Sequence, residues 1–253
     1  MVSGSAALQT RLARVFGAAG MKVMEGYGLT ETSPVVSVGM YNDKNYKIGT
    51  VGKPIDNVEV KIAEDGELLI KGPNVMMGYY KDPEKTADVM TNDYFHTGDK
   101  GVIDEEGFLK ITGRKKEMFK TSGGKYVIPP LLENDMKQSL FIEQIMVVGE
   151  GEKMPAAIIQ PNFEYIKDWI DDNDYEIGTS NSEIASSSIV IEQIQEDITK
   201  FNKNFGKWEQ IKRFELTPDV WSIDEGHLTP TMKMKRSVIR KKYDDLYEKI
   251  YRP

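Results

Sequence analysis

Within five residues, the segment Tyr27–Glu31 (YGLTE) offers an aromatic ring, a hydroxyl and a carboxylate. Tyr27 could stack on a base, Thr30 could bond a phosphate oxygen, and Glu31 could hold Mg²⁺, a hard cation that takes oxygen ligands. A tight turn is the competing interpretation, because glycine, serine, threonine and proline surround these residues and Ser-Pro favours leaving a helix. The segment by itself is compatible with both a nucleotide site and a turn.

Basic side chains gather in two other segments, Arg114–Lys125 and Lys233–Lys242, of a chain whose formal net charge is −7. One such run is usually a solvated face, but two in an acidic protein are more typical of side chains that converge on phosphate groups. The acidic balance argues against general nucleic-acid binding, and we expect no nucleic-acid partner.

The composition excludes several kinds of chemistry. The 253 residues include no cysteine, which rules out disulfides, thiol nucleophiles and zinc–thiolate sites. His96 and His227 have neither metal-ligand spacing nor a nucleophile beside them, so we interpret both as structural, with His96 a pocket-edge candidate. No apolar run approaches the roughly 20 residues of a membrane span, and a cytoplasmic location is expected.

The elements that would position these residues begin with a helix and a strand. Ser5–Ala19 has a serine suited to the N-cap and an apolar stripe, and 21–26 has the pattern of a strand, which together indicate an α/β unit. The residues before this helix have the character of a strand end, so we expect the chain to begin inside a domain. From 48 to 112, alternating apolar residues with Asp-Gly and Glu-Gly turns predict hairpins of a barrel or sandwich.

Beyond about Arg114–Glu117 the pattern changes to α+β. The long polar segment 171–188 is predicted to be a loop. The predicted regular elements are, in order, a helix over 129–140, strands over 144–149 and 155–161, a helix through Ile194–Phe205 and a last helix through Ile239–Ile250.

Four motifs occur in order along the chain: GYGLTETSP (26–34), YFHTGD (94–99), ITGRKKEMFKTSGGKYVIP (111–129) and LTPTMKMKR (228–236). In this order and spacing they resemble the adenylate-forming acyl-CoA synthetase family, and within it the long-chain fatty acid–CoA ligases. The resemblance covers nearly the whole chain and is weakest over about 165–205. It implies an α+β fold. Residues 1–115 would hold a remnant of an α/β subdomain and a β-barrel-like subdomain, the C-terminal part of a large AMP-binding domain, and 116–253 a hinged, mobile α+β domain.

The resemblance implies an acid–thiol ligase of fatty acid metabolism. ATP, a fatty acid and CoA would be its substrates, and Mg²⁺ its metal. The fatty acid carboxylate attacks the α-phosphate of ATP to give acyl-AMP, and after a domain rotation the CoA thiol takes the acyl group. Peripheral membrane contact would fall to sequence outside this chain. A fatty acyl-AMP ligase that loads a carrier protein is one alternative, and a non-catalytic nucleotide- or CoA-binding module is another.

The resemblance assigns the nucleotide site to three of these motifs and to the start of the chain. Asp99 would accept hydrogen bonds from both ribose hydroxyls, a role that suits an ionised carboxylate because it only accepts; an Asx-turn is the competing interpretation. The other implied positions are Gly4 and Ser5 bordering the adenine and acyl pocket, Tyr27 facing the adenine, nucleotide-binding Gly28, Thr30 at a phosphate, Glu31 at Mg²⁺ and Arg114 at the ribose or a phosphate.

Three further roles follow from the resemblance. Lys116 would be the hinge, and the SGGK segment, made of Ser122, Gly123, Gly124 and Lys125, would approach CoA in the second step. Lys233 aligns best with the lysine of the adenylation step, where an ammonium group and Mg²⁺ can stabilise charge that builds on phosphate oxygens. The segment has the form TPTMKMK instead of the commoner TxSGKxxR, so Lys235 stays open as the rival.

One family motif has no counterpart in this sequence. The Ser/Thr/Gly-rich phosphate-gripping loop of the form SGTTGxPKG is missing, and TSGG at 121–124 lacks its pattern and occupies the CoA-loop position. In the family this loop lies well upstream, as does most of the acyl tunnel. We therefore expect this chain to be the C-terminal portion of a longer ligase and to be inactive by itself.

Overall fold

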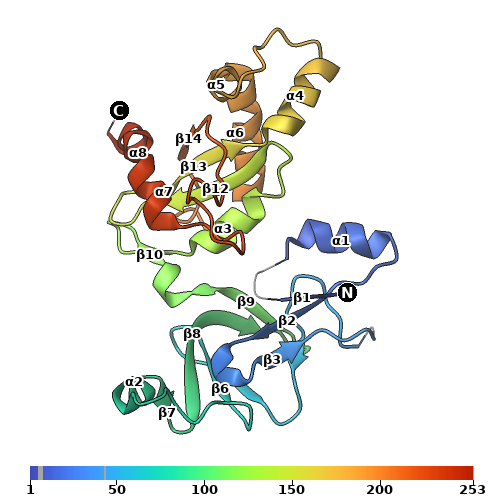
Figure 1. Ribbon diagram of the computed structural model, residues 1–253, viewed down its shortest axis with the longest axis vertical. Helices are drawn as coiled ribbons and strands as arrows, with labels where there is room; N and C mark the ends of the chain where they lie inside the picture. The colour runs from blue at the N-terminus through green and yellow to red at the C-terminus, as the bar shows by residue number, and fades with distance from the viewer. Residues whose placement is uncertain (5–7, 43, 253) are drawn as a thin grey trace. The chain divides into compact units, whose positions relative to one another are not determined.

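The computed structural model describes residues 1–4, 8–42 and 44–252 and contains two compact units, Met1–Glu117 and Met118–Pro253 (Figure 1). Each unit has sheets of its own, and the predicted α+β fold class is confirmed. The predicted roles of 1–115 as part of an AMP-binding domain and of 116–253 as a mobile domain stay predictions.

The first unit begins with a small α/β layer. β1 (Val2–Ser3) and β2 (Met24–Gly28) are parallel, and α1 (Thr10–Ala18) lies in the connection between them, since parallel strands need a crossover. β3 (Val35–Val38) and β4 (Lys53–Pro54) continue the sheet with antiparallel pairing in the order β1-β2-β3-β4. The start of the YGLTE motif therefore belongs to an inner strand.

The helix of this layer is shorter than predicted. It begins at Thr10, because the residue before it has extended backbone angles (φ −59°, ψ 125°) and the amide of Leu8 donates to Glu25 Oε2 at 3.3 Å. Ser5, the predicted N-cap, lies outside the described residues. Gly20 follows the helix in the left-handed conformation (φ 78°) that glycine adopts without strain.

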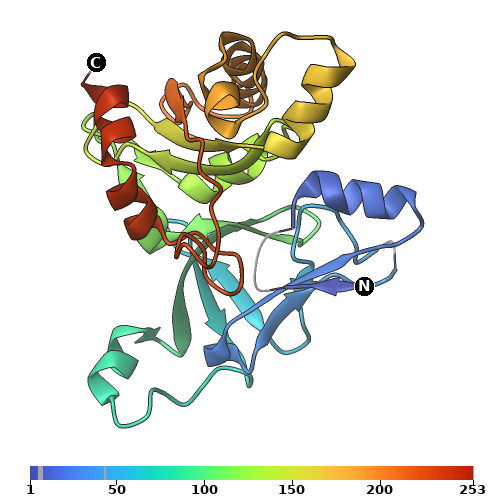
Figure 2. The same cartoon turned by 45° about the horizontal axis from the view of Figure 1, so that its top comes forward.

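A half-barrel of five antiparallel strands completes the first unit (Figure 2). Its strand order is β5-β6-β8-β7, with β9 paired to β8. The hairpins predicted at Asp65-Gly66 and Glu106-Gly107 are confirmed, and they join β5 to β6 and β8 to β9. The strands are β5 (Glu59–Ile62), β6 (Glu67–Lys71), β7 (Met90–Thr91), β8 (Tyr94–Ile103) and β9 (Leu109–Arg114).

A short helix within this β-rich region was not predicted. α2 (Pro83–Asp88) begins where Asp82 Oδ1 accepts the amide of Lys85 at 3.0 Å, with proline at the first helical position. Both are standard features of a helix start, but the helix has only six residues. The alternating apolar residues of the neighbouring strands dominate the pattern of this region, so a helical pattern this short does not stand out in the sequence.

In the second unit, a three-stranded sheet lies between two apolar cores. The strands are β12 (Ile142–Val148), β13 (Ala156–Pro161) and β14 (Arg213–Leu216). Successive side chains of a strand point to opposite faces, so β12 and β13 contribute alternate residues to the two cores. One core is completed by α3 (Pro129–Met136), α4 (Phe163–Asp172), α5 (Asn181–Ser186) and α6 (Ser188–Asn202), and the other by α7 (Arg236–Lys242) and α8 (Asp244–Tyr251) (Figures 1 and 2).

Two predictions for this unit are wrong. The polar segment 171–188 is not all loop, because α5 begins at a capping box in which Ser180 Oγ accepts the amide of Glu183 at 3.3 Å. The predicted last helix is two helices, α7 and α8, which meet at Tyr243. That residue leaves helical geometry (φ −107°, ψ 40°) while its buried hydroxyl donates to Asp219 Oδ2 at 3.0 Å.

Candidate nucleotide-binding site

Asp99 is a buried carboxylate on β8 to which two other motifs converge. Its side chain is only 4% exposed. Tyr27, from β2, donates its hydroxyl to Asp99 Oδ2 at 2.7 Å, and Arg114 Nε lies 2.9 Å from Asp99 Oδ1. Arg114 stands directly opposite Asp99 in the β8–β9 ladder. The structure thus brings together three residues that the sequence assigned to one site.

This arrangement leaves Asp99 with capacity for a ligand. Each carboxylate oxygen has two lone-pair positions, and one on each is taken by Tyr27 or Arg114. A pair of neighbouring hydroxyl donors could therefore bond the same carboxylate without displacing either partner. The Arg114 side chain is 47% exposed, so this end of the cluster is open to solvent.

The phenol of Tyr27 is held in its neutral form. Burial raises the pKa of Tyr27, and the negative charge of Asp99 and the hydrogen bond to it raise that pKa further. A neutral phenol donates a hydrogen bond to the carboxylate, whereas a phenolate would repel the carboxylate. Tyr27 therefore orients Asp99 across the whole physiological pH range.

A bulge in β8 aims Asp99. In the β6–β8 ladder the register shifts between Glu67 and Leu69, and residues 97–99 of β8 form the extra length opposite that shift. Gly98 has φ 70°, a conformation that favours glycine. Thr97 Oγ1 donates to the carbonyl of Leu68 at 2.9 Å and accepts the amide of Asp99 at 3.0 Å. Bulges redirect side chains next to functional sites, and this one turns Asp99 toward Tyr27.

The segment after β2 is also a tight turn, η1 (Thr30–Thr32). A Cβ on Gly28 would lie 1.9 Å from the carbonyl oxygen of Pro34, so only glycine fits there. Thr32 Oγ1 accepts the amide of Leu29 at 3.0 Å and donates to Pro34 at 2.6 Å. Thr30 is exposed on this turn. The backbone is therefore a turn, as the competing interpretation proposed, and Thr30 and Glu31 both lie on this turn.

Glu31 has a partner that sequence reasoning missed. The hydroxyl of Tyr79 donates to Glu31 Oε1 at 3.0 Å, and the amide of Met76 donates to the Glu31 carbonyl at 2.8 Å. Within residues 1–4, 8–42 and 44–252, no group of three or more His, Cys, Asp or Glu residues could hold a metal ion. A lone carboxylate nevertheless fits Mg²⁺, which is usually bound by one or two carboxylates together with substrate phosphates and water.

Of the two positions predicted at the start of the chain, one is described. Gly4 follows β1 and is exposed, and a Cβ on it would lie 3.8 Å from the carbonyl oxygen of Gly26 in β2. Gly4 therefore lies beside the strand that carries Tyr27. Ser5 lies outside the described residues.

Lys116 lies in η2 (Lys115–Glu117), at the end of the first unit. Its side chain is exposed. The preceding residue, Lys115, is anchored to Asp65 at 2.8 Å and to Glu67 at 3.0 Å. The hinge role of Lys116 stays a prediction.

The CoA-approach segment forms the turn of a small hairpin in the second unit. Residues 122–125 join β10 (Phe119–Lys120) to β11 (Tyr126–Val127) and are exposed. Gly124 has φ 77°, and its amide donates to the carbonyl of Thr121 at 2.9 Å. Lys125 Nζ lies 5.6 Å from the centre of the Trp208 ring. The predicted Ser122, Gly123, Gly124 and Lys125 are thus one exposed turn.

Lys233 and Lys235 lie in a loop that ends at α7. The loop is closed by a bridge between Leu228 and Met234, and the amide of Thr229 donates to the Lys233 carbonyl at 2.8 Å. Both lysines are exposed, and neither ammonium group has a hydrogen bond or ion pair with any described residue. The backbone therefore orders both positions and leaves both charges available, so the choice between them stays open.

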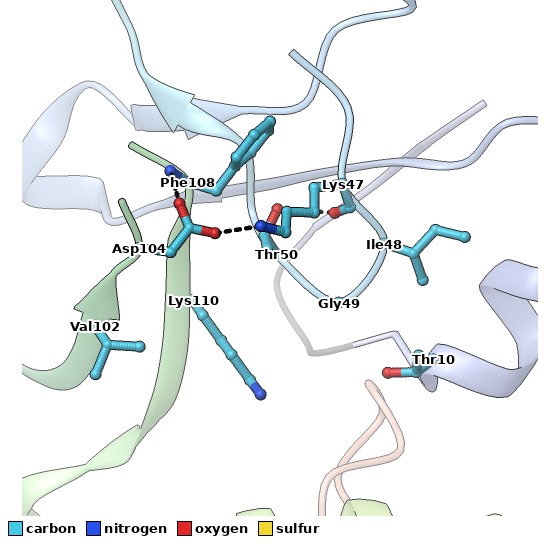
Figure 3. A pocket seen from close by; sticks show the side chains of 9 residues that line it. All are labelled: Thr10, Lys47, Ile48, Gly49, Thr50, Val102, Asp104, Phe108 and Lys110. Carbon is cyan, nitrogen blue, oxygen red and sulfur yellow. Dashed lines mark hydrogen bonds and ion pairs between the residues drawn. The ribbon is translucent and has the colours of Figure 1, made fainter. Parts of the chain in front are cut away.

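A separate hollow of about 280 Å³ lies in the first unit (Figure 3). Lys47, Asp104, Phe108 and Lys110 are among its lining residues, and none of the site residues predicted from the sequence lines it. Lys47 Nζ is 2.7 Å from Asp104 Oδ2, so its charge is already paired. We give this hollow no part in the candidate site.

Family models match both units. Residues 1–80 match AMP-binding enzyme, and residues 117–253, more than half of the chain, match AMP-binding enzyme C-terminal domain. The chain belongs to the AMP-binding enzyme family. Tyr27 and Glu31 fall within the first matched segment, and Asp99 and Arg114 fall between the two.

Curated relatives of this family member include long-chain fatty-acid–CoA ligases. The chain is 40% identical over 250 residues to the long-chain fatty-acid–CoA ligase FadD15 of Mycobacterium bovis, covering 99% of this chain and 41% of that protein. It is 36% identical over 270 residues to long-chain fatty-acid–CoA ligase 1 of Homo sapiens, covering 99% of this chain and 38% of that protein. The chain therefore spans about two fifths of the length of these relatives.

Solved structures of similar fold include an ATP-bound chimera of RpMatB and BxBclM. It has a TM-score of 0.73 and 27% identity, covering 97% of this chain and 46% of the other. The anthranilate–CoA ligase AuaEII in complex with anthranoyl-AMP has a TM-score of 0.70 at 22% identity, covering 95% of this chain and 44% of the other, a likeness of fold alone. In the part of the chain that the structure describes, no helix is both long and apolar enough to cross a membrane.

Proposed function

We propose that this chain supplies the ribose-binding side of an adenylate site in an ATP-dependent ligase. The ligase activates a long-chain fatty acid as acyl-AMP and transfers it to CoA. The observation that carries the proposal is the convergence of Tyr27 and Arg114 on the buried carboxylate of Asp99. Membership of the AMP-binding enzyme family and likeness to long-chain fatty-acid–CoA ligases support it.

Asp99 recognises the ribose in this proposal. Its two oxygens accept the two ribose hydroxyls, while Tyr27 and Arg114 keep the carboxylate in one orientation. Hydrogen bonds to a charged group are worth about 1.5–3 kcal/mol each, so a diol bonded in this way is a substantial part of nucleotide affinity. The aromatic face of Tyr27 serves the adenine, as the resemblance implies.

The phosphates bind at the turn after β2. Thr30 would bond a phosphate oxygen, and Glu31, oriented by Tyr79, is the residue that would hold Mg²⁺. Bound Mg²⁺ supplies positive charge that offsets the negative charge of the triphosphate. Lys233, with Lys235 as its rival, donates to the oxygens on which charge develops when the fatty acid carboxylate attacks the α-phosphate and pyrophosphate leaves.

The second half-reaction uses the second unit. Rotation about Lys116 moves the Lys233 loop away from the acyl-AMP and brings the Ser122–Lys125 turn in its place. This turn then approaches the CoA arm. The CoA thiol loses its proton and attacks the acyl carbonyl, and AMP leaves. The small, exposed glycine turn allows a narrow ligand arm to pass close to the backbone.

The proposal is tested in a ligase of the relatives' full length that carries this sequence. Palmitate, Mg-ATP and CoA should give palmitoyl-CoA, AMP and pyrophosphate in equal amounts. Asp99→Ala should raise the KM for ATP at least tenfold, because two bonds to a charged group are lost. Acyl-AMP that accumulates with CoA and is consumed only by a carrier protein would favour the carrier-loading ligase. Absence of any fatty-acid-dependent pyrophosphate release would contradict the proposal.

A further inference from the structure

Glu67 is a buried carboxylate that the proposed function does not use. It opens β6 and is only 5% exposed. Three donors surround it: the amide of Gly98 lies 2.9 Å from Oε1, and Lys115 Nζ and His96 Nδ1 lie 3.0 and 3.1 Å from Oε2. A buried carboxylate costs free energy unless it is paired, and this one is paired on both oxygens.

The donors around Glu67 hold both strands of the candidate site. Gly98 directly precedes Asp99 and belongs to the bulge that aims it. Lys115 directly follows Arg114, the residue that pairs with Asp99 Oδ1. One carboxylate therefore fixes the neighbour of each member of the Asp99–Arg114 pair.

The charge of Glu67 is stable in this setting. Burial acts to raise the pKa of Glu67, but hydrogen bonds from Lys115, His96 and Gly98 outweigh it, and the pKa lies below its ordinary value. Charge-assisted bonds of this kind are shorter and about twice as strong as neutral ones. A neutral side chain of the same size could keep the bond to Gly98 but would lose the attraction of Lys115.

We propose that Glu67 is a positioning residue of the adenylate site, which holds the β8 bulge and the end of β9 so that Asp99 presents both oxygens to the ribose hydroxyls. This inference rests on the proposed function, since it needs a nucleotide at Asp99. Glu67 itself touches no ligand. It acts only through Gly98 and Lys115, the neighbours of the two residues that would meet the ribose.

The test compares two nucleotides in the 253-residue chain. AMP carries the ribose diol, and 2′,3′-dideoxyadenosine monophosphate lacks it. The affinity of wild-type protein for each is measured by NMR titration, which also reports the hydrogen exchange of the Gly98 amide. We expect AMP to bind at least tenfold more tightly than the dideoxy nucleotide, since the diol makes two bonds to a charged group.

Glu67→Gln should lower that preference to about threefold or less and speed exchange at Gly98, because a neutral acceptor bonds the Gly98 amide about half as strongly as a carboxylate and no longer attracts Lys115. Partial unfolding would reduce the number of binding sites without changing the ratio of the two affinities. Glu64→Gln, an exposed glutamate in the same turn, is the matched control and should behave as wild type in both measurements.

The outcomes separate this inference from the proposed function. An undiminished preference for AMP in Glu67→Gln overturns the inference alone, whatever happens to exchange at Gly98. Failure of the wild-type chain to bind AMP overturns the proposed function and this inference with it. Should Glu67→Gln not fold, Lys115→Gln carries the test, because Lys115 is 43% exposed and a glutamine amide can still donate a hydrogen bond to Glu67. It should also reduce the preference for AMP, and an unchanged preference would overturn the inference.

Discussion

Asp99 is held by two neighbours that stabilise it in different ways. Arg114 lies opposite it in the ladder and brings a positive charge to Oδ1, whereas Tyr27 brings a neutral donor to Oδ2. The carboxylate in turn keeps the phenol protonated, and its charge adds to the effect of burial on the pKa of Tyr27. The pair is therefore a structural contact as well as a candidate binding feature.

This contact predicts how stability changes at alkaline pH. The folded-state pKa of Tyr27 is raised above the ordinary tyrosine value of about 10, so its contribution to the free energy of unfolding is present below about pH 10 and is lost as pH rises above it. Tyr27→Phe should flatten the fall in unfolding free energy above pH 10 by up to about 1.4 kcal/mol per pH unit, measured by urea unfolding. Tyr41→Phe is the control, because Tyr41 is 67% exposed. A Tyr27→Phe slope equal to that of wild type would contradict the contact.

Lys233 is predicted to serve adenylation and not thioester formation. In a ligase of the relatives' length that carries this sequence, Lys233→Ala should slow acyl-AMP formation by roughly 10²–10³-fold, the loss seen when one oxyanion donor is removed. Thioester formation from supplied acyl-AMP should stay nearly normal, as measured in single-turnover assays of each half-reaction. If Lys235→Ala gives this pattern and Lys233→Ala does not, the roles of the two lysines are exchanged.

Motifs predicted the main residues of the site but not their supports. Tyr27, Asp99 and Arg114 stand in segments whose order along the chain carries the resemblance, so the sequence alone predicts one shared site for them, and the structure places both Tyr27 and Arg114 against Asp99. Glu67 and Tyr79 lie in the segment 66–86, which also resembles the family, but the sequence assigns neither of them a role, because residue type does not show which side chain each will contact. Glu67 lies 31 residues from Gly98 and Tyr79 lies 48 from Glu31, and only folding brings these partners together.

Among the elements, α7 is tied to the rest of the second unit by a buried ion pair. Arg236, at the start of α7, bonds Glu133 of α3, and the other oxygen of Glu133 accepts the amide of Val147 at 2.8 Å. Glu133 is 4% exposed. The pair therefore fixes the end of the loop that carries Lys233 to the core of the unit.

Removing one partner of that pair should cost far more than removing a surface pair on the same helix. Arg236→Ala is expected to reduce the free energy of unfolding by about 3 kcal/mol, because it removes the guanidinium that pairs with the buried Glu133 carboxylate. Arg240→Ala breaks the pair with the exposed Asp244 and should cost no more than about 1 kcal/mol. Urea unfolding at neutral pH measures both. Equal losses in the two variants would mean that the Glu133 pair contributes little.

The short η2 element contains Lys116, the predicted hinge, and this role can be tested by substitution. Lys115 is anchored to Asp65 and Glu67, so freedom to rotate begins after it, at Lys116. Proline locks φ near −65° and removes the amide donor. In the full-length ligase, Lys116→Pro should spare adenylation and slow thioester formation by about tenfold or more, while Lys116→Ala should spare both. Equal loss of both half-reactions in a folded Lys116→Pro variant would point away from a hinge at this residue.

Long periodic elements were predictable, and short or interrupted ones were not. β12 and β13 contain the short apolar runs 145–148 (IMVV) and 156–159 (AAII), and the hairpins of the half-barrel have Asp-Gly and Glu-Gly turns. The break at Tyr243 comes from a buried hydroxyl that bonds Asp219, a tertiary contact that interrupts a continuous helical stripe. The β8 bulge likewise depends on pairing with β6, which the sequence of β8 alone does not contain.

At the scale of the whole molecule, each unit has its own buried framework. The second unit encloses a sheet between two apolar cores, and the first combines an α/β layer with a half-barrel. The chain spans 41% of the length of the Mycobacterium bovis relative, so the complete reaction is a proposal for a longer protein. What the chain itself should retain is recognition of the ribose by Asp99, with weak affinity because the phosphate-gripping loop is not in its sequence.

The most direct test of that central claim is an isothermal titration of the 253-residue chain with AMP and with 2′,3′-dideoxyadenosine monophosphate, in wild type and in Asp99→Asn. Wild type should bind AMP in the millimolar range, about −4 kcal/mol, and should bind the dideoxy nucleotide at least tenfold more weakly. Asp99→Asn keeps the size of the side chain but loses its charge, and it should bind the two nucleotides about equally. A wild-type chain that binds both nucleotides with the same affinity, or that binds AMP no better than Asp99→Asn does, would contradict the account.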